Sequence, residues 1–210
     1  NPIRNAANWV AWRLETSDLG SAHRKNDFKA DPLLPLEFYR VTPQDYAHSG
    51  YDRGHLCPSG DRTRDAEENS ITFRMTNMLP QVHELNAGPW EKLEQYERKR
   101  AVASDGSLYI VAGGVFSGAP RVIGNGVAVP SASYKIIVVL AKGQPVAEVS
   151  AASEVIAVRI PNEPSVAGRP FRDFVVAVDD LENETGYNFL GGVSEPIQRA
   201  LEATRHAVAN

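Results

Sequence analysis

The chain has 210 residues, 42% of them hydrophobic, and its formal net charge is −4. This length and apolar content are enough to bury a full core, so we expect one domain over residues 1–210. No apolar run is long enough to cross a membrane, and the lone Cys57 excludes an intrachain disulfide. The acidic balance argues against a strongly basic nucleic-acid-binding protein, so composition alone does not indicate such a function.

The first half of the chain predicts a strand over residues 9–14, followed by a polar segment and a proline-rich connection. Residues 72–78 alternate loosely between apolar and polar types and predict a short strand, which Pro80 should end. Residues 86–100 predict a helix, because Pro89 falls in its first turn and basic residues complement its carboxyl end. Together with the segment around His55, this gives the order strand, histidine loop, strand, helix.

The second half predicts further strands and a terminal helix. Residues 107–114, 134–141 and 155–160 are β-branched and apolar, as buried strands should be. Residues 171–178 predict one more strand, and residues 195–208 predict an amphipathic helix. The sequence therefore predicts an α+β fold with a central, mainly antiparallel sheet flanked by helices.

The run Tyr51-Asp52-Arg53-Gly54-His55-Leu56-Cys57-Pro58-Ser59 is the most informative stretch of the sequence. Histidine is the natural general base near neutral pH, and arginine is a fixed donor to phosphate. We expect Gly54 to let the backbone turn sharply before the histidine. The four residues Asp-Arg-Gly-His alone are equally compatible with a surface turn that holds a solvated salt bridge.

Two further motifs follow, Phe73-Arg74-Met75-Thr76-Asn77-Met78-Leu79-Pro80-Gln81 and Asn86-x-Gly88-x-Trp90-x-x-Leu93-Glu94. With the Asp-Arg-Gly-His run, they resemble the DNA/RNA non-specific endonucleases that have a ββα-metal site. The bacterial and cyanobacterial sugar-non-specific nucleases look most similar. Flanking similarity extends from residue 8 to residue 190, and the ββα-metal motif falls at about residues 50–102.

The resemblance implies that His55 is the general base and that Asn86 is the protein ligand of a divalent ion. An asparagine carbonyl oxygen suits Mg²⁺, although Mn²⁺ or another divalent ion is also compatible. A single neutral ligand makes a weak site, so we expect an exchangeable metal that is completed by water and substrate.

Five further site residues follow from the resemblance. Glu94 would lie roughly 12 Å from Asn86 along a continuous helix, which favours a role in holding metal-bound water unless the helix bends at Pro89. An ordinary helical ion pair with Arg98 is the alternative. The other matched positions and their expected roles are Arg53 and Arg98 on phosphate, Asp52 beside a metal-bound water, and Asn77, which could equally be a turn residue.

The remaining aromatic and sulfur-containing residues fit a structural role. We expect Trp9, Trp12 and Trp90 to lie in the core and Cys57 to be a small buried side chain. The histidines other than His55 show no metal-ligand spacing.

The implied activity is metal-dependent hydrolysis of DNA and RNA, which leaves 5′-phosphate and 3′-hydroxyl ends. Water as the nucleophile permits both polymers, since only RNA offers a 2′-hydroxyl. Two alternatives stay open: a nucleic-acid-binding protein with impaired catalysis, and a phosphodiesterase for small esters. The resemblance also implies a secreted or periplasmic protein and a possible inhibitor protein. The arginines that we expect to converge on the substrate are Arg53, Arg62, Arg64, Arg74 and Arg98.

Overall fold

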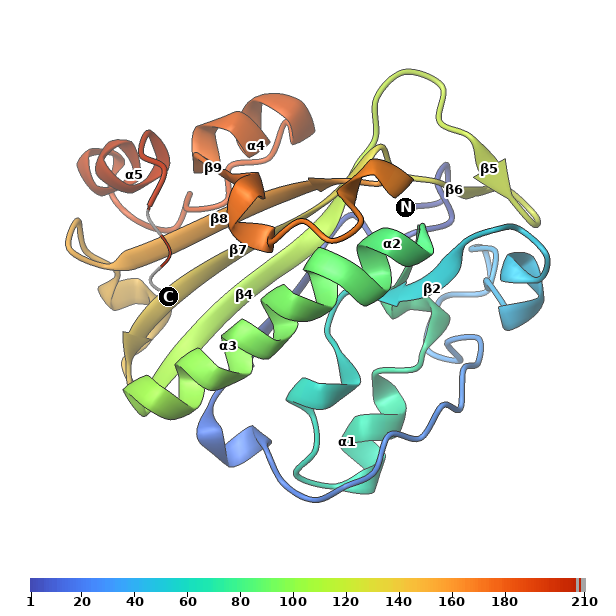
Figure 1. Cartoon of the computed structure of the whole chain (residues 1–210), viewed down its shortest axis with the longest axis horizontal. Coiled ribbons are helices and arrows are strands. Elements are labelled where there is room, and N and C mark those ends of the chain that lie inside the picture. Colours follow the sequence, from blue (N-terminus) through green and yellow to red (C-terminus); the bar gives the residue numbers. More distant parts are fainter. Residues whose placement is uncertain (207, 209–210) are drawn as a thin grey trace.

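A five-stranded antiparallel sheet organises the computed structural model, which describes residues 1–206 and residue 208 (Figure 1). Its strand order is β1-β4-β7-β8-β9, and every neighbouring pair is antiparallel. The strands are β1 (Val10–Leu14), β4 (Gly106–Val115), β7 (Ala132–Ala141), β8 (Glu154–Pro161) and β9 (Val175–Val176). The predicted α+β class with a mainly antiparallel central sheet is confirmed.

Among the described residues, two short ladders, five α-helices and several short 3₁₀ or π-type segments surround the sheet. The ladders pair β2 (Asp52–His55) with β3 (Met78–Gln81), and β5 (Val122–Ile123) with β6 (Val127–Ala128). The helices are α1 (Ala66–Ile71), α2 (His83–Leu85), α3 (Glu91–Ser104), α4 (Val178–Thr185) and α5 (Glu195–Glu202). None of these helices combines the length and the apolar character that a membrane crossing requires.

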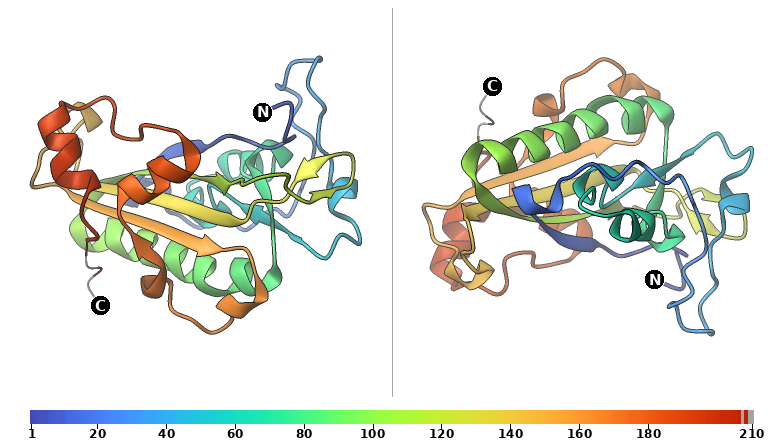
Figure 2. Two further views of the ribbon diagram at one scale, coloured as in Figure 1. Left: turned by 90° about the horizontal axis from the view of Figure 1, so that it is seen from above. Right: turned by 90° about the horizontal axis from the view of Figure 1, so that it is seen from below.

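Both faces of the sheet are buried. Successive side chains along β7 point to opposite faces, and nearly all of them are buried. Tyr134, Ile136 and Val138 pack with α4 and α5, whereas Ile137 packs on the other face beneath α3. Figures 1 and 2 show α3 along one face and α4 with α5 on the other. Strand β2 and helix α2 also lie on the α3 side (Figure 1). Lys135 also points to that side, because it alternates with the residues under α4.

Two of the predicted strands differ in position or extent from those in the structure. The strand expected at residues 72–78 lies at Met78–Gln81 instead, and it includes Pro80. That ladder has only two strands, so β3 has a free edge, where a proline without an N–H is tolerated. The strand expected at residues 171–178 is a 3₁₀ turn (Phe171–Phe174) followed by the two residues of β9.

The carboxyl-terminal region also differs from the prediction. Helix α4 was missed, although acidic residues in its first turn and Gly186 in the left-handed conformation at its end are helix signals. The helix expected at 195–208 ends at Glu202, and residue 207 lies outside the described residues. Trp9 is 53% exposed, so its predicted core position is wrong, whereas Trp12 and Trp90 are buried.

Gly54 has a different function from the one predicted. It lies inside β2, opposite Leu79, and makes no turn. A Cβ atom at Gly54 would lie 2.1 Å from the Oε1 atom of Gln81, so only glycine leaves room for this side chain to cross the ladder. Gln81 then donates a 2.8 Å hydrogen bond to Ser133 on β7, which ties the ladder to the main sheet.

Candidate active site

Strand β2, the loop that follows it and helix α3 line a polar cavity of about 330 Å³. Between the β2–β3 ladder and α3, the chain forms a wide turn over Asn86–Trp90, in which Gly88 has the non-helical angles φ −110° and ψ −118°. This kink replaces the continuous helix and allows Asn86 and Glu94 to line the same cavity. The charged and polar side chains that line it include Arg24, Arg53, His55, Asn86, Glu94 and Arg98.

His55 is a buried imidazole held by its surroundings. Its exposure is 6%, and its ring makes edge contacts with Phe28 and Phe73 at centroid distances of 5.7 and 4.9 Å. Its carbonyl oxygen accepts a 3.0 Å hydrogen bond from the indole N–H of Trp90. Its Nε2 has no partner among the described residues. Burial, and then the charges of Arg24 and Arg53, lower the pKa of His55 from 6.5 to about 3. The imidazole is therefore neutral and unprotonated at one nitrogen near neutral pH.

This lowered pKa makes the stability of the protein depend on pH. Between pH 6.5 and about 3 the unfolded chain binds more protons at His55 than the folded chain, so stability falls as the pH drops through this window. The slope from this group is at most about 1.4 kcal/mol per pH unit. Urea unfolding of the wild type and of His55→Gln across the window measures it. We expect a flatter curve for the variant, and equal slopes would contradict the burial of a neutral imidazole.

Asp52 orients Asn86. The side-chain N–H of Asn86 donates to Oδ2 of Asp52 at 2.9 Å, so the carbonyl oxygen of Asn86 is left for another ligand. The same Oδ2 lies 2.9 Å from Nδ1 of His83, an exposed residue that sequence reasoning did not assign to the site. Asp52 is thus placed to hold the amide in one orientation.

The guanidinium of Arg98 is held in place by the buried carboxylate of Asp61, which sequence reasoning did not identify. Asp61 is fully buried and accepts from Nη1 of Arg98 at 3.0 Å and from the indole N–H of Trp12 at 3.0 Å. Gly60 makes room for this contact, because a Cβ atom there would lie 2.8 Å from Nη1 of Arg98. The predicted alternative, in which Arg98 merely pairs with Glu94 along the helix, is not what the structure shows.

A second buried ion pair lies between α3 and the sheet. Lys135 on β7 and Glu97 on α3 are both fully buried, with Nζ 3.1 Å from the carboxylate. The ammonium of Lys135 also lies 4.5 Å from the ring centroid of Trp90 and 5.4 Å from that of Trp12. Burial raises the pKa of Glu97, and it raises that of the nearby Glu94 to about 7, while the charge of Lys135 opposes both shifts.

Arg24 is a site residue that sequence reasoning missed. Its Nη1 donates to Oγ of Ser59 at 2.9 Å, its Nε donates to Asn26 at 2.7 Å, and its guanidinium lies 5.0 Å from the ring centroid of Phe73. No local motif marks it, because its segment is held in place by a contact far along the chain, the parallel bridge between Lys29 and Arg74.

Other predicted residues do not reach the cavity. Asn77 is 9% exposed and bonds to backbone, accepting from the N–H of Cys57 and donating to the carbonyls of Cys57 and Thr72. It holds the chain after β2. Of the five arginines expected to converge, Arg53 and Arg98 line the cavity. The other three lie elsewhere: Arg62 near Asp18, Arg64 paired with Glu68, and Arg74 beside a separate cavity.

The catalytic ion implied by the resemblance fits this donor set. Asn86 offers a neutral oxygen, and Glu94 adds a carboxylate to the same cavity. Hard oxygen donors of this kind suit Mg²⁺ or a similar ion that retains several waters. Within the described part of the chain, no three His, Cys, Asp or Glu side chains gather at this cavity.

Comparison with known proteins supports the family resemblance that the sequence motifs indicate. The family model described as DNA/RNA non-specific endonuclease matches residues 1–195. A nuclease from the cyanobacterium Nostoc sp. is 46% identical over 97% of this chain and 73% of its own length. Human mitochondrial endonuclease G is 30% identical over 92% of the chain and 66% of its own length.

A solved structure gives the same result at the level of the fold. In a crystal structure of the EndoG/EndoGI complex, a chain 26% identical to this one aligns with a TM-score of 0.79. The alignment covers 92% of this chain and 82% of that chain. The chain therefore belongs to the DNA/RNA non-specific endonuclease family and is an endonuclease.

Proposed function

We propose that the chain hydrolyses phosphodiester bonds of both DNA and RNA at the cavity around His55, and that it leaves 5′-phosphate and 3′-hydroxyl ends. The observation that carries this proposal is the buried, neutral His55, whose Nε2 lacks a partner among the described residues, in a cavity that three arginines also line. A free imidazole nitrogen accepts a proton, and guanidinium groups bind a phosphate and the charge that develops on it.

Each residue then has a defined task. His55 accepts the proton of the attacking water at Nε2. Arg24, Arg53 and Arg98 bind the phosphate oxygens and stabilise the added negative charge. Asp52 holds the Asn86 amide so that its oxygen faces a ligand. We propose that Asn86 binds a divalent ion, with Glu94 accepting hydrogen bonds from the water around it. When bound, Mg²⁺ supplies charge stabilisation for the phosphorane and the leaving oxygen.

A long polymer fits the site better than a small ester. A second cavity of about 630 Å³ adjoins the first and shares Arg24, Arg53 and Asn86 with it. It is also lined by Phe28 and Tyr51, and an arginine lies over each ring, Arg53 at 4.2 Å from the Phe28 centroid and Arg121 at 5.5 Å from that of Tyr51. Together the two cavities have room for nucleotides beyond the scissile phosphate. The predicted role as a binding protein without catalysis is disfavoured, because the proposed acid–base and phosphate groups are all present.

The test is cleavage of supercoiled plasmid and of single-stranded RNA with Mg²⁺ or with excess EDTA, followed by end-group analysis. We expect Mg²⁺-dependent degradation of both polymers, and we expect Asn86→Ala to need far more metal. Asn183→Ala is the matched control, because Asn183 is exposed on α4. Cleavage that resists EDTA would overturn the metal site. Preference for a small bis-aryl phosphodiester would favour the alternative esterase.

Asp61 should affect the reaction through Arg98. We expect Asp61→Asn to lower kcat about tenfold with little change in KM, because Arg98 loses the charge that fixes its guanidinium. Steady-state kinetics on a defined oligonucleotide measures both constants. In the Arg98→Ala background the same substitution should have no further effect on kcat, and independent losses would contradict the positioning role.

Two finer expectations stay predictions. A protein inhibitor is suggested by the similar EndoG structure, which was solved as a complex with EndoGI and concerns EndoG inhibition. The secreted or periplasmic location is also a prediction, and several relatives carry the names of mitochondrial nucleases.

A further inference from the structure

Three carboxylates meet on the face of the sheet that lies opposite the active site. Asp179 and Glu182 are three residues apart on α4 and so share one side of the helix. Glu202 is the last residue of α5. One oxygen from each of the three side chains lies within 4.8 Å of the other two. In Figure 1 these two helices lie across the sheet from α3.

The buried carboxylate of Glu202 is an independent sign of a ligand at this cluster. Its exposure is 6%, and its Oε1 is buried without a hydrogen-bond partner among the described residues. An unsatisfied carboxylate in such a position is costly. Burial, with the charges of Glu182 and Asp179, raises the pKa of Glu202 to about 7.

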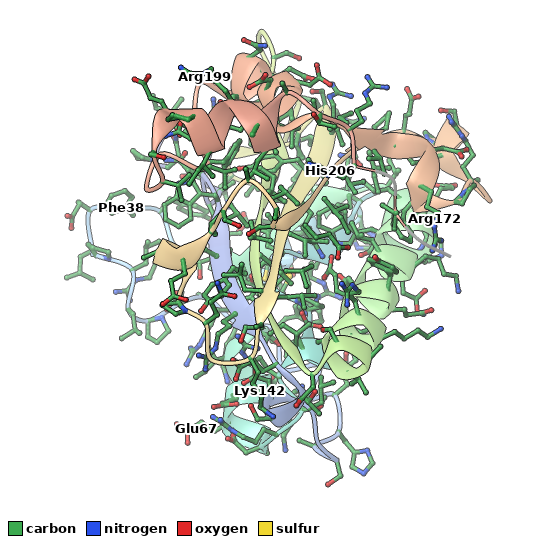
Figure 3. All side chains as sticks on the ribbon, turned by 90° about the vertical axis from the view of Figure 1, so that its left-hand side faces the viewer. Phe38, Glu67, Lys142, Arg172, Arg199 and His206 are labelled. Carbon is green, nitrogen blue, oxygen red and sulfur yellow. The ribbon has the colours of Figure 1, made fainter. Side chains whose placement is uncertain are left out.

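The cationic side chains nearby are directed elsewhere. Arg199 pairs with Glu195 on the outer side of α5, where Figure 3 shows it pointing away from the sheet. Arg205 pairs with Asp180, 3.6 Å away, and not with any member of the cluster. Across the part of the chain that the structure describes, no ion pair involves Asp179, Glu182 or Glu202.

We propose that these three carboxylates bind Ca²⁺ and thereby fasten α5 to α4. Calcium accepts six to eight oxygen ligands at about 2.4 Å in flexible geometry, so two of its ligands can be as much as about 4.8 Å apart. The three oxygens, all within 4.8 Å of one another, are close enough for a small shift of the side chains to bring them onto one calcium ion. Mg²⁺ demands a tighter octahedron, with opposite oxygens only about 4.2 Å apart. Water on the open side completes the shell.

An ion at this position would hold α4 and α5 together. Glu182 already accepts a 2.7 Å hydrogen bond from the N–H of Phe189, in the connection between the two helices. Leu181 and Leu201 are fully buried beneath the cluster. An ion held by both helices would oppose the separation of α5 from this part of the core, and it would remove the repulsion among three like charges.

The experiment separates this site from the catalytic one by working in the Asn86→Ala background. We expect saturating CaCl₂ to raise the melting temperature of that protein by about 5 °C. We also expect it to slow amide hydrogen exchange in α4 and α5. Adding Glu202→Gln should abolish both effects, whereas Glu195→Gln, on an exposed part of the same helix, should leave them unchanged.

Asp179→Asn provides a second variant should Glu202→Gln fold poorly, and it should also abolish the response to calcium. A calcium effect that persists in both variants would place the ion elsewhere and overturn the proposal. Absence of any effect in the Asn86→Ala protein would also overturn it. In that case, the carboxylates share a proton, and the melting temperature should rise as the pH falls below about 7.

Discussion

His55→Ala is expected to lower the rate of cleavage by about 10²–10⁴-fold, while binding of nucleic acid without metal is retained. The substitution removes the one imidazole among the described residues that line the cavity, and this imidazole is neutral with a free nitrogen near neutral pH. General bases contribute about this much to the rate. The arginines that line the same cavity stay in place, and they account for most of the attraction to phosphate. Single-turnover cleavage and fluorescence anisotropy measure the two properties separately.

Two controls make this result specific. His23→Ala removes an exposed histidine outside the cavity and should cleave at nearly the normal rate. Added imidazole should restore part of the activity of His55→Ala, because it replaces the missing base without restoring the contacts to Phe28 and Phe73. A His55→Ala protein that cleaves nearly as fast as the wild type would show that another group accepts the proton.

The sequence was informative where the motifs are short and local. The motifs around His55 and Asn86 predicted the order strand, histidine loop, strand, helix. The structure has a strand and a helix after the histidine, but His55 itself lies at the end of strand β2 and not in a loop. Pro80 misled the placement of β3, because proline normally ends a strand, whereas this one lies on a free edge. Gly54 was interpreted as a turn residue, because a close approach by Gln81 from another strand leaves no mark on the local pattern.

The parts that escaped prediction depend on contacts between residues far apart in the chain. Asp61 and Arg98 are 37 residues apart, and Lys135 and Glu97 are 38 apart. Arg24 reaches the cavity from a polar segment without regular structure. No periodicity or spacing rule connects such pairs, since only the packing of α3 on the sheet brings them together. The proposed calcium site likewise joins two helices, one of which the sequence pattern did not reveal.

Lys135→Met is expected to lower the free energy of unfolding by about 3–5 kcal/mol, because it leaves the fully buried Glu97 without its partner. The methionine also loses the attraction between the ammonium and the ring of Trp90. Trp90 in turn donates to the carbonyl of His55, so this substitution loosens the support of the catalytic histidine as well. Urea unfolding in EDTA measures the change in stability, and the intrinsic fluorescence of the protein, to which Trp9, Trp12 and Trp90 contribute, reports on the surroundings of its tryptophans.

The double variant Lys135→Met/Glu97→Leu separates two effects on the free energy of unfolding: the cost of burying an unpaired carboxylate, and the net contribution of the ion pair. Removal of both charges avoids burying an unpaired carboxylate, so we expect stability to return to within about 1 kcal/mol of the wild type. Simple addition of the two single losses would mean instead that the pair itself stabilises the fold by several kcal/mol. If the double variant recovers stability but not kcat, the ion pair serves to position α3 for catalysis. Glu94 and Arg98 project from that helix into the active-site cavity, so a small shift of α3 would displace both side chains.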